Sequence, residues 1–188
     1  QHGVRTLAHA DGGGVLVAAP DAETDLLIDL IHAGLDRFGV CNRLNLLLLP
    51  NDTMLDVVRP VFDELGVTLS LPPHDHPLGH EWSLDDGREK TVTVSFVDNL
   101  AEAAQIASEL TPGIAATIVT ANPATAEAFI DAYTGTGVFW NSTTRLLDGY
   151  KLLGVPETGI NVEHVPGPRG PVTFRDLVLR QFVVRPKD

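Results

Sequence analysis

Several kinds of residue are scarce in this 188-residue sequence. Its single cysteine excludes an internal disulfide, so a disulfide-stapled secreted fold is not indicated. Lysine and arginine together number 13 against 25 aspartate and glutamate residues, which gives a net charge of −12. Nucleic acids and anionic membranes are bound by cationic surfaces, so we expect neither as a partner. No apolar run approaches the roughly 18 residues of a membrane span, and neither a GxGxxG nor a P-loop motif occurs.

Short apolar runs alternate along the chain with segments of helical period. The pattern predicts strands over residues 14–19, 44–49, 67–71, 91–97, 115–119 and 137–140, and helices over 21–38, 51–66, 99–110 and 122–133. Such alternation is typical of an α/β fold, in which helices cover both faces of a mostly parallel sheet. We expect residues 1–172 to form this domain, and residues 173–188 to form a C-terminal extension with a last strand at 177–185.

Two segments could carry chemistry. Ligand sites in parallel α/β sheets collect at the carboxyl ends of the strands, which favours the polar turn 141–149. Its start, Asn141–Arg145, suits a carboxylate or phosphate, although an ordinary hydrogen-bonded turn is at least an equal interpretation. Cys41 lies in a helix-to-strand loop. There it is either a small buried apolar residue or a nucleophile that could hold an acyl group as a thioester.

Two further clusters favour structural interpretations. His74, His76 and His80 lie close together in the irregular segment 72–90, but their spacing matches no established metal motif. We expect a solvated surface loop there and no bound metal. Gly12–Gly14 precedes a predicted strand instead of following one, so it indicates flexible turn glycines and no phosphate-binding loop.

Five short segments, taken in chain order, carry a resemblance to a known family. They are Gly12–Asp21, Val40–Leu44, Asn141–Arg145 with Asp148–Tyr150, Glu157–Ile160 and Arg169–Pro171. Together they resemble the catalytic half of the gamma-glutamyl phosphate reductases, a family of the aldehyde dehydrogenase superfamily. The resemblance covers nearly the whole chain and implies an aldehyde dehydrogenase catalytic-domain-like fold.

The resemblance also implies a mechanism and a set of site residues. Cys41 is the expected nucleophile, which attacks the acyl phosphate of an activated glutamate and is then released from the thioester by hydride from NADPH. The product would be glutamate 5-semialdehyde, an intermediate of proline biosynthesis. The residues expected to hold the substrate are Asn42, Asn141, Thr143, Thr144 and Arg145.

The same resemblance leads us to expect that NADPH is bound mainly by a part that this chain lacks. The absent initial methionine agrees with a fragment or excised domain, for which we expect no turnover on its own. No signal peptide is visible, so a cytoplasmic location is expected. Members of the superfamily add a C-terminal strand to a neighbour's sheet, which leads us to expect a homodimer formed through the C-terminal strand.

Some positions depart from the family pattern. Gly14 and Val15 stand where the family usually has Cys-His, Asn45 replaces an acidic residue, and Ile114 lies where a histidine is expected. Glu81-Trp82 is the nearest counterpart of an acidic-aromatic pair that approaches the nicotinamide ribose in relatives. These changes leave an alternative open, namely a diverged non-catalytic paralogue, acting as a binding or oligomerisation domain, or a reductase of another aminoacyl phosphate.

Overall fold

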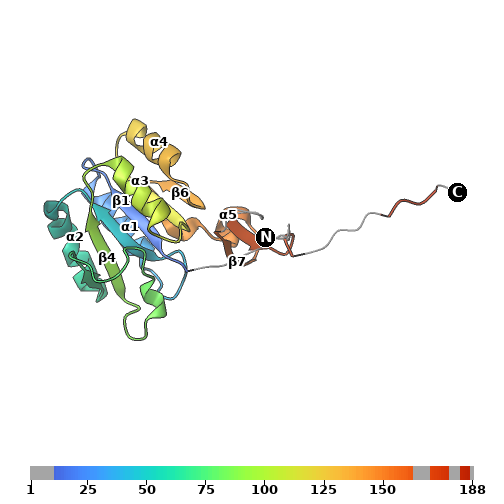
Figure 1. The fold of residues 1–188 in the computed structure, drawn as a ribbon, viewed down its shortest axis with the longest axis horizontal. Helices are drawn as coiled ribbons and strands as arrows, with labels where there is room; N and C mark the ends of the chain where they lie inside the picture. Colours follow the sequence, from blue (N-terminus) through green and yellow to red (C-terminus); the bar gives the residue numbers. More distant parts are fainter. Residues whose placement is uncertain (1–10, 163–169, 178–182, 187–188) are drawn as a thin grey trace.

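A computed structural model describes residues 11–162, 170–177 and 183–186 (Figure 1). The elements along the chain are β1 (Gly14–Ala18), α1 (Thr24–Gly34), β2 (Leu44–Leu49), α2 (Asp52–Leu65), β3 (Thr68–Ser70), η1 (Trp82–Leu84), β4 (Thr91–Phe96), α3 (Leu100–Glu109), β5 (Ala115–Val119), α4 (Pro123–Ala132), β6 (Gly137–Trp140), η2 (Thr144–Leu146), α5 (Gly149–Leu153), β7 (Glu157–Asn161) and β8 (Gly170–Thr173). The two η elements are single turns of 3₁₀ helix.

The main sheet has six strands in the order β3-β4-β2-β1-β5-β6, and every neighbouring pair is parallel. The central strands β1, β2 and β5 are buried along their whole length, as expected for a parallel sheet with both faces covered. The predicted parallel α/β sheet is therefore confirmed. Among the described residues, no helix is long and apolar enough to cross a membrane.

The alternation of side chains along β1 and β2 divides the core into two layers. Leu16, Leu47 and Leu49 join the layer that contains the buried residues of α1 and α2. Val17 and Leu48 point to the other face, into the layer that contains the buried residues of α3 and α4. Successive residues of a strand face opposite sides of the sheet, so a continuous apolar strand supplies both layers at once.

Helix ends follow local capping chemistry. The side chain of Asn51 accepts a hydrogen bond from the backbone N–H of Met54 at 3.0 Å, and Gly66 ends α2 in the left-handed region with φ +63°. Asn99 caps α3 in the same way, accepting from the backbone N–H of Glu102 at 2.9 Å. Pro60 predicts a kink or a delayed start for α2, yet the helix runs through it from Asp52 to Leu65.

The first helix is shorter than its periodicity predicts. It begins at Thr24 and ends at Gly34, whereas the apolar spacing predicts a helix over 21–38. Leu35 remains 3% exposed after the helix has ended, so its apolar character serves the core and does not report a further helical turn. The early end leaves residues 35–43 as a loop, and this loop carries Cys41.

The C-terminal part forms a separate two-stranded antiparallel ribbon of β7 and β8 (Figure 1). The run 167–171 predicts a turn, which is wrong for Gly170 and Pro171 because both lie in β8. Of the strand predicted over 177–185, residue 177 and residues 183–185 are described and lie in no strand, and residues 178–182 lie outside the described residues. The domain division expected at 172/173 stays a prediction, although β8 runs across it.

Candidate active site

The loop that carries Cys41 lies at the amino-terminal edge of the parallel sheet. Strand β2 begins at Leu44, and its neighbour β1 begins at Gly14, which pairs with Leu44. Cys41 is half-buried and packs against a small apolar cluster formed by Ile114, Ala115, Leu147, Ile160 and Val162. Ile114, at the position where the resemblance leads one to expect a histidine, is fully buried and belongs to this apolar wall.

Three consecutive glycines pack directly against the Cys41 loop. A Cβ atom on Gly12 would lie 2.6 Å from the Cα and carbonyl oxygen of Cys41, and one on Gly14 would lie 2.8 Å from the carbonyl oxygen of Arg43. The backbone N–H of Gly13 donates to the carbonyl oxygen of Cys41 at 2.7 Å, and Gly13 itself has φ +119°. The interpretation of these residues as flexible turn glycines is therefore wrong, because Gly12 and Gly14 allow a close backbone approach and Gly13 adopts a positive φ.

Asn42 is tied to the segment that follows β6. Its Nδ2 donates to the carbonyl oxygen of Leu147 at 2.9 Å, and its own carbonyl oxygen accepts from the hydroxyl of Thr144 at 2.8 Å. Its Oδ1 accepts from Nη1 of Arg145. Asn42 is 3% exposed, so its polar groups hold the loop and its neighbour Cys41 in place from within the protein.

Arg145 connects this network to the end of the first helix. Its Nε donates to Oδ1 of Asp36 at 2.8 Å, so two of its nitrogens are engaged by Asp36 and Asn42. Thr143 begins the 3₁₀ turn, and its hydroxyl accepts from the backbone N–H of Arg145 at 3.2 Å. The structure thus brings Asn42, Thr144 and Arg145 together beside Cys41, with Thr143 adjoining them.

Asn141 does not join this group. Its side chain binds the backbone N–H and carbonyl oxygen of Thr120, beyond the carboxyl end of β5, and its backbone N–H donates to Ile118. Ile118 lies three residues along β5 from Ala115, the partner of Gly14, so about 10 Å of strand separates the two edges. Asn141 adopts φ +49° there, in the left-handed region that asparagine tolerates.

The surroundings of Cys41 disfavour its thiolate form. Burial raises the pKa of the Cys41 thiol, and the negative charges of Glu157 and Glu81 raise the pKa further. A backbone hydrogen bond and the charge of Arg145 act in the opposite direction, but the net pKa shift is upward. Sequence reasoning missed Glu157, which is distant in the chain and reaches the site from β7, where its carboxylate accepts from the backbone N–H of Gly149 at 2.7 Å.

Glu81 acts on Cys41 through the segment Gly12–Gly14, the glycine turn. One of its carboxylate oxygens accepts from the backbone N–H of Gly12, and the other accepts from the hydroxyl of Ser83 at 2.7 Å. Glu81 also lines an open cavity of about 730 Å³, whose apolar wall includes Leu78, Leu84 and Leu110. The cavity adjoins the Cys41 site through Glu81 and lies on the side of the loop 77–85.

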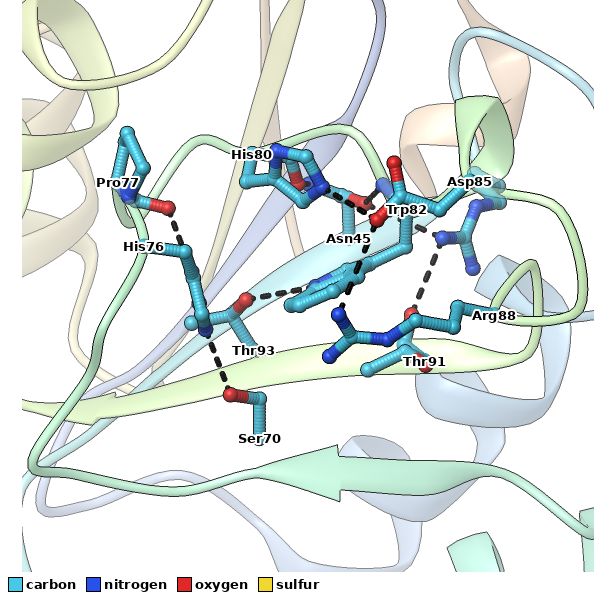
Figure 2. A network of polar contacts seen from close by, with 11 residues as sticks. Asn45, Ser70, His76, Pro77, His80, Trp82, Asp85, Arg88, Thr91 and Thr93 are labelled. Carbon is cyan, nitrogen blue, oxygen red and sulfur yellow. Dashed lines mark hydrogen bonds and ion pairs between the residues drawn. The ribbon is translucent and has the colours of Figure 1, made fainter.

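Two of the three histidines, His76 and His80, pack against one tryptophan (Figure 2). The rings of His76 and His80 meet Trp82 edge-on at centroid distances of 4.7 and 4.6 Å. His76 shares a hydrogen bond of 2.7 Å with Ser70, and His80 pairs with Asp85 at 2.9 Å. The expected surface loop is observed, since the residues of 72–90 other than Trp82 are exposed or part-exposed. Trp82 is 1% exposed and anchors the segment. Within the described ranges no group of three His, Cys, Asp or Glu residues is arranged to hold a metal ion.

Comparisons with known proteins bear on this site. No family model matches the chain. A gamma-glutamyl phosphate reductase from Prochlorococcus marinus (strain AS9601) is 30% identical over 97% of the chain and 44% of its own length. One from Synechococcus sp. (strain WH7803) is 28% identical with the same coverage. The resemblance to gamma-glutamyl phosphate reductases is confirmed. The chain spans just under half the length of the curated relatives it matches.

Solved structures agree on the fold. The gamma-glutamyl phosphate reductase of Thermotoga maritima matches with a TM-score of 0.81 and 22% identity over 96% of the chain and 47% of that protein. An acetylating aldehyde dehydrogenase from Geobacillus thermoglucosidasius matches with a TM-score of 0.70 and 12% identity over 97% of the chain and 53% of that protein. An NADP-dependent glyceraldehyde-3-phosphate dehydrogenase from Bacillus halodurans, solved with NADP, has a TM-score of 0.59 and 12% identity over 71% of the chain and 38% of that protein. The chain therefore shares the fold of these reductase and dehydrogenase structures, as the sequence resemblance leads one to expect.

Proposed function

We propose that this chain supplies the thiol chemistry of an acyl phosphate reductase that forms glutamate 5-semialdehyde from gamma-glutamyl phosphate in proline biosynthesis, with NADPH as the reductant. One observation carries the proposal. Cys41 is held on a loop fixed by Gly13 on one side and by Thr144 and Arg145 on the other, in a chain similar to gamma-glutamyl phosphate reductases over 97% of its length.

The proposed reaction begins at the sulfur of Cys41. The thiol loses its proton, and the sulfur attacks the carbonyl carbon of the acyl phosphate. The bond from that carbon to the phosphate oxygen breaks, phosphate leaves, and the acyl group remains on Cys41 as a thioester. When bound, a reduced nicotinamide supplies the hydride that converts the thioester carbon to an aldehyde and returns the sulfur as a thiolate.

Proton removal is the step to which the described residues contribute most. Burial and the charge of Glu157 raise the pKa of the Cys41 thiol, so thiolate formation calls for a nearby proton acceptor. Among the charged groups that act on the thiol, Glu157 has the largest influence. We assign Glu157 as the acceptor of the thiol proton, and Arg145 as the cation that favours the resulting thiolate.

We expect the anionic groups of the substrate to be bound by residues next to Cys41 on the turn after β6. Thr143 and Arg145 are the proposed direct contacts, because they lie beside Cys41 on the turn that follows β6. The polar side-chain atoms of Asn42 and Thr144 are hydrogen-bonded to other protein groups, so we assign these two residues to holding the Cys41 loop. Asn141 lies at the other edge of the sheet, so its proposed contribution is to the conformation of the turn.

The cavity beside Glu81 fits the nicotinamide end of the cofactor and does not fit its phosphates. Leu78, Leu84 and Leu110 offer an apolar wall for a flat ring, and Glu81 offers an acceptor for ribose hydroxyls. The other charged residues that line the cavity are carboxylates, namely Asp11, Asp85 and Glu109. These would repel a pyrophosphate, so NADPH phosphates are assigned to a part of the enzyme outside the described residues.

The assembly and location expected from the sequence are part of the proposal. Large apolar side chains are exposed near the C-terminal end of the chain, at Phe174, Leu177, Val183 and Val184. Such a segment is suited to pairing with a second copy, which supports a homodimer through the C-terminal strand in a cytoplasmic enzyme. A strictly monomeric mass by light scattering at micromolar concentration would contradict the dimer.

The reductase assignment is tested by reduction kinetics with gamma-glutamyl phosphate and NADPH, comparing the full-length enzyme, including its cofactor-binding part, with its Cys41→Ser variant. We expect the variant to lose activity because a serine hydroxyl is a weaker nucleophile than a thiol and would form an oxygen ester instead of a thioester. Glu64→Gln, near the end of α2, is the control variant and should leave the rate unchanged. Full activity of Cys41→Ser would overturn the assignment of the nucleophile.

A further inference from the structure

The side chain of Asn45 forms hydrogen bonds with the backbone of the residues before and after Glu81. It is the second residue of β2 and is 2% exposed. Its Nδ2 donates to the carbonyl oxygen of His80 at 2.7 Å, and its Oδ1 accepts from the backbone N–H of Trp82 at 3.3 Å. Figure 2 shows Asn45 beneath the loop, with contacts to the residues before and after Glu81.

Glu81, Gly12 and Cys41 lie against one another in that order. The Glu81 carboxylate accepts from the backbone N–H of Gly12, and Gly12 rests on Cys41 so closely that a Cβ would lie 2.8 Å from the Cβ of Cys41. The neighbouring Gly13 rests on Asn45, where a Cβ would lie 3.0 Å from Nδ2. Asn45 therefore contacts both the loop that carries Glu81 and the glycine turn that covers Cys41.

We propose that Asn45 is a positioning residue that holds the Glu81 carboxylate at the glycine turn, beside Cys41. An amide suits this task because it donates to His80 and accepts from Trp82 at the same time, whereas a carboxylate only accepts. A third contact fixes the amide's orientation, because Nη2 of the buried Arg43 donates to Oδ1 of Asn45 at 3.2 Å. The inference rests on the proposed function only in assigning a role to Cys41.

The position of Glu81 matters because few charges act on Cys41. The charged groups that face the thiol are Glu157 from β7, Glu81 from the loop before η1, and Arg145 from η2. Both carboxylates disfavour the thiolate, and Arg145 favours it. A change that lets Glu81 move away from the glycine turn should therefore make the thiolate easier to form.

The test is the pH profile of Cys41 alkylation by iodoacetamide, which needs neither cofactor nor substrate. Cys41 is the single cysteine of the chain, so adduct formation measured by intact mass reports on it alone. Glu81→Gln keeps an acceptor for Gly12 and removes the charge, and we expect it to lower the apparent pKa of the Cys41 thiol. Asn45→Ala should shift the profile in the same direction by an equal or smaller amount, because Glu81 is then released.

The double variant gives the sharper result. If Asn45 acts through Glu81, Asn45→Ala adds no further shift to Glu81→Gln. Asn99→Ala, which removes a helix cap at the other edge of the sheet, is the matched asparagine control and should leave the profile unchanged. If Asn45→Ala does not fold, Asn45→Ser retains a small polar group at the buried position and is measured instead.

Two results would overturn the inference. One is a profile of Asn45→Ala, or of its serine substitute, that equals the wild-type profile while Glu81→Gln shifts. The other is a shift of equal size in the presence and absence of the Glu81 charge, which would mean that Asn45 acts independently. Loss of reductase activity plays no part in this readout, so failure of the proposed function would be seen separately.

Discussion

Arg145→Ala should destabilise the protein mainly through Asn42 and only slightly through Asp36. Arg145 donates to both residues, but the two partners lie in different environments. The side chain of Asp36 is 52% exposed, and an ion pair with so exposed a partner contributes about 0–1 kcal/mol. Asn42 is 3% exposed, and a buried acceptor left without its donor costs about 1–3 kcal/mol.

The expected loss for Arg145→Ala is therefore about 2–4 kcal/mol in the free energy of unfolding, with the charge-assisted bond and the buried stem included. Asp36→Asn is the matched control, because it removes the ion pair and leaves the bond to Asn42. We expect it to cost about 0–1 kcal/mol. Urea unfolding, followed by the fluorescence of the buried Trp82 and the part-exposed Trp140, measures both values.

The comparison of the two variants can refute the reasoning. If Asp36→Asn destabilises the protein as much as Arg145→Ala does, the surface ion pair holds the turn and Asn42 does not. If Arg145→Ala costs less than about 1 kcal/mol, the bond to Asn42 contributes nothing measurable. The assignment of Asn42 as the residue that fixes the Cys41 loop would fail in either case.

Three further predictions concern stability and are tested by urea or thermal unfolding. Gly14→Ala places a Cβ 2.8 Å from the carbonyl oxygen of Arg43 and should cost about 1–3 kcal/mol; an unchanged urea midpoint would show that the turn yields. Arg43 is 1% exposed, and its Nε and Nη1 have no hydrogen-bond partner among the described residues. Because such a buried cation is costly to desolvate, Arg43→Met should leave the free energy of unfolding unchanged or raise it. A loss above about 2 kcal/mol would contradict this. Burial and the neighbouring His76 lower the pKa of His74, so the unfolded chain binds a proton more readily and stability should fall as the pH drops from about 7 to 5. His74→Leu should lessen that loss in thermal melts at the two pH values, and an equal loss in both proteins would exclude His74 as its source.

The elements of the sheet could be predicted because their signals are local. Leu46–Leu49 is a continuous apolar run, which a strand buried on both faces requires, and Asn99 with Glu102 marks a helix start within four residues. The end of α1 could not be predicted, because Leu35 is apolar for reasons of core packing and continues the helical period by coincidence. Strand β8 was hidden for a related reason, since glycine and proline at its start also signal a turn.

The site was only partly predictable. The resemblance pointed to Cys41, Asn42, Thr144 and Arg145, which the fold does bring together. The rule that sites lie at the carboxyl ends of strands does not locate them, because they meet at the amino-terminal edge. Gly12 and Glu157 lie in segments that carry the resemblance, but their place beside Cys41 was not predicted, because it depends on packing against residues far away in the sequence.

Formation of a thioester on Cys41 tests the central claim most directly. The protein is incubated with acetyl phosphate as a probe, and its intact mass is recorded before and after treatment with hydroxylamine, which cleaves thioesters. We predict one acetyl group per chain on Cys41, removable by hydroxylamine, absent from Cys41→Ser and formed more slowly in Glu157→Gln. The absence of any adduct that depends on Cys41 would contradict the account and favour a non-catalytic role for the chain.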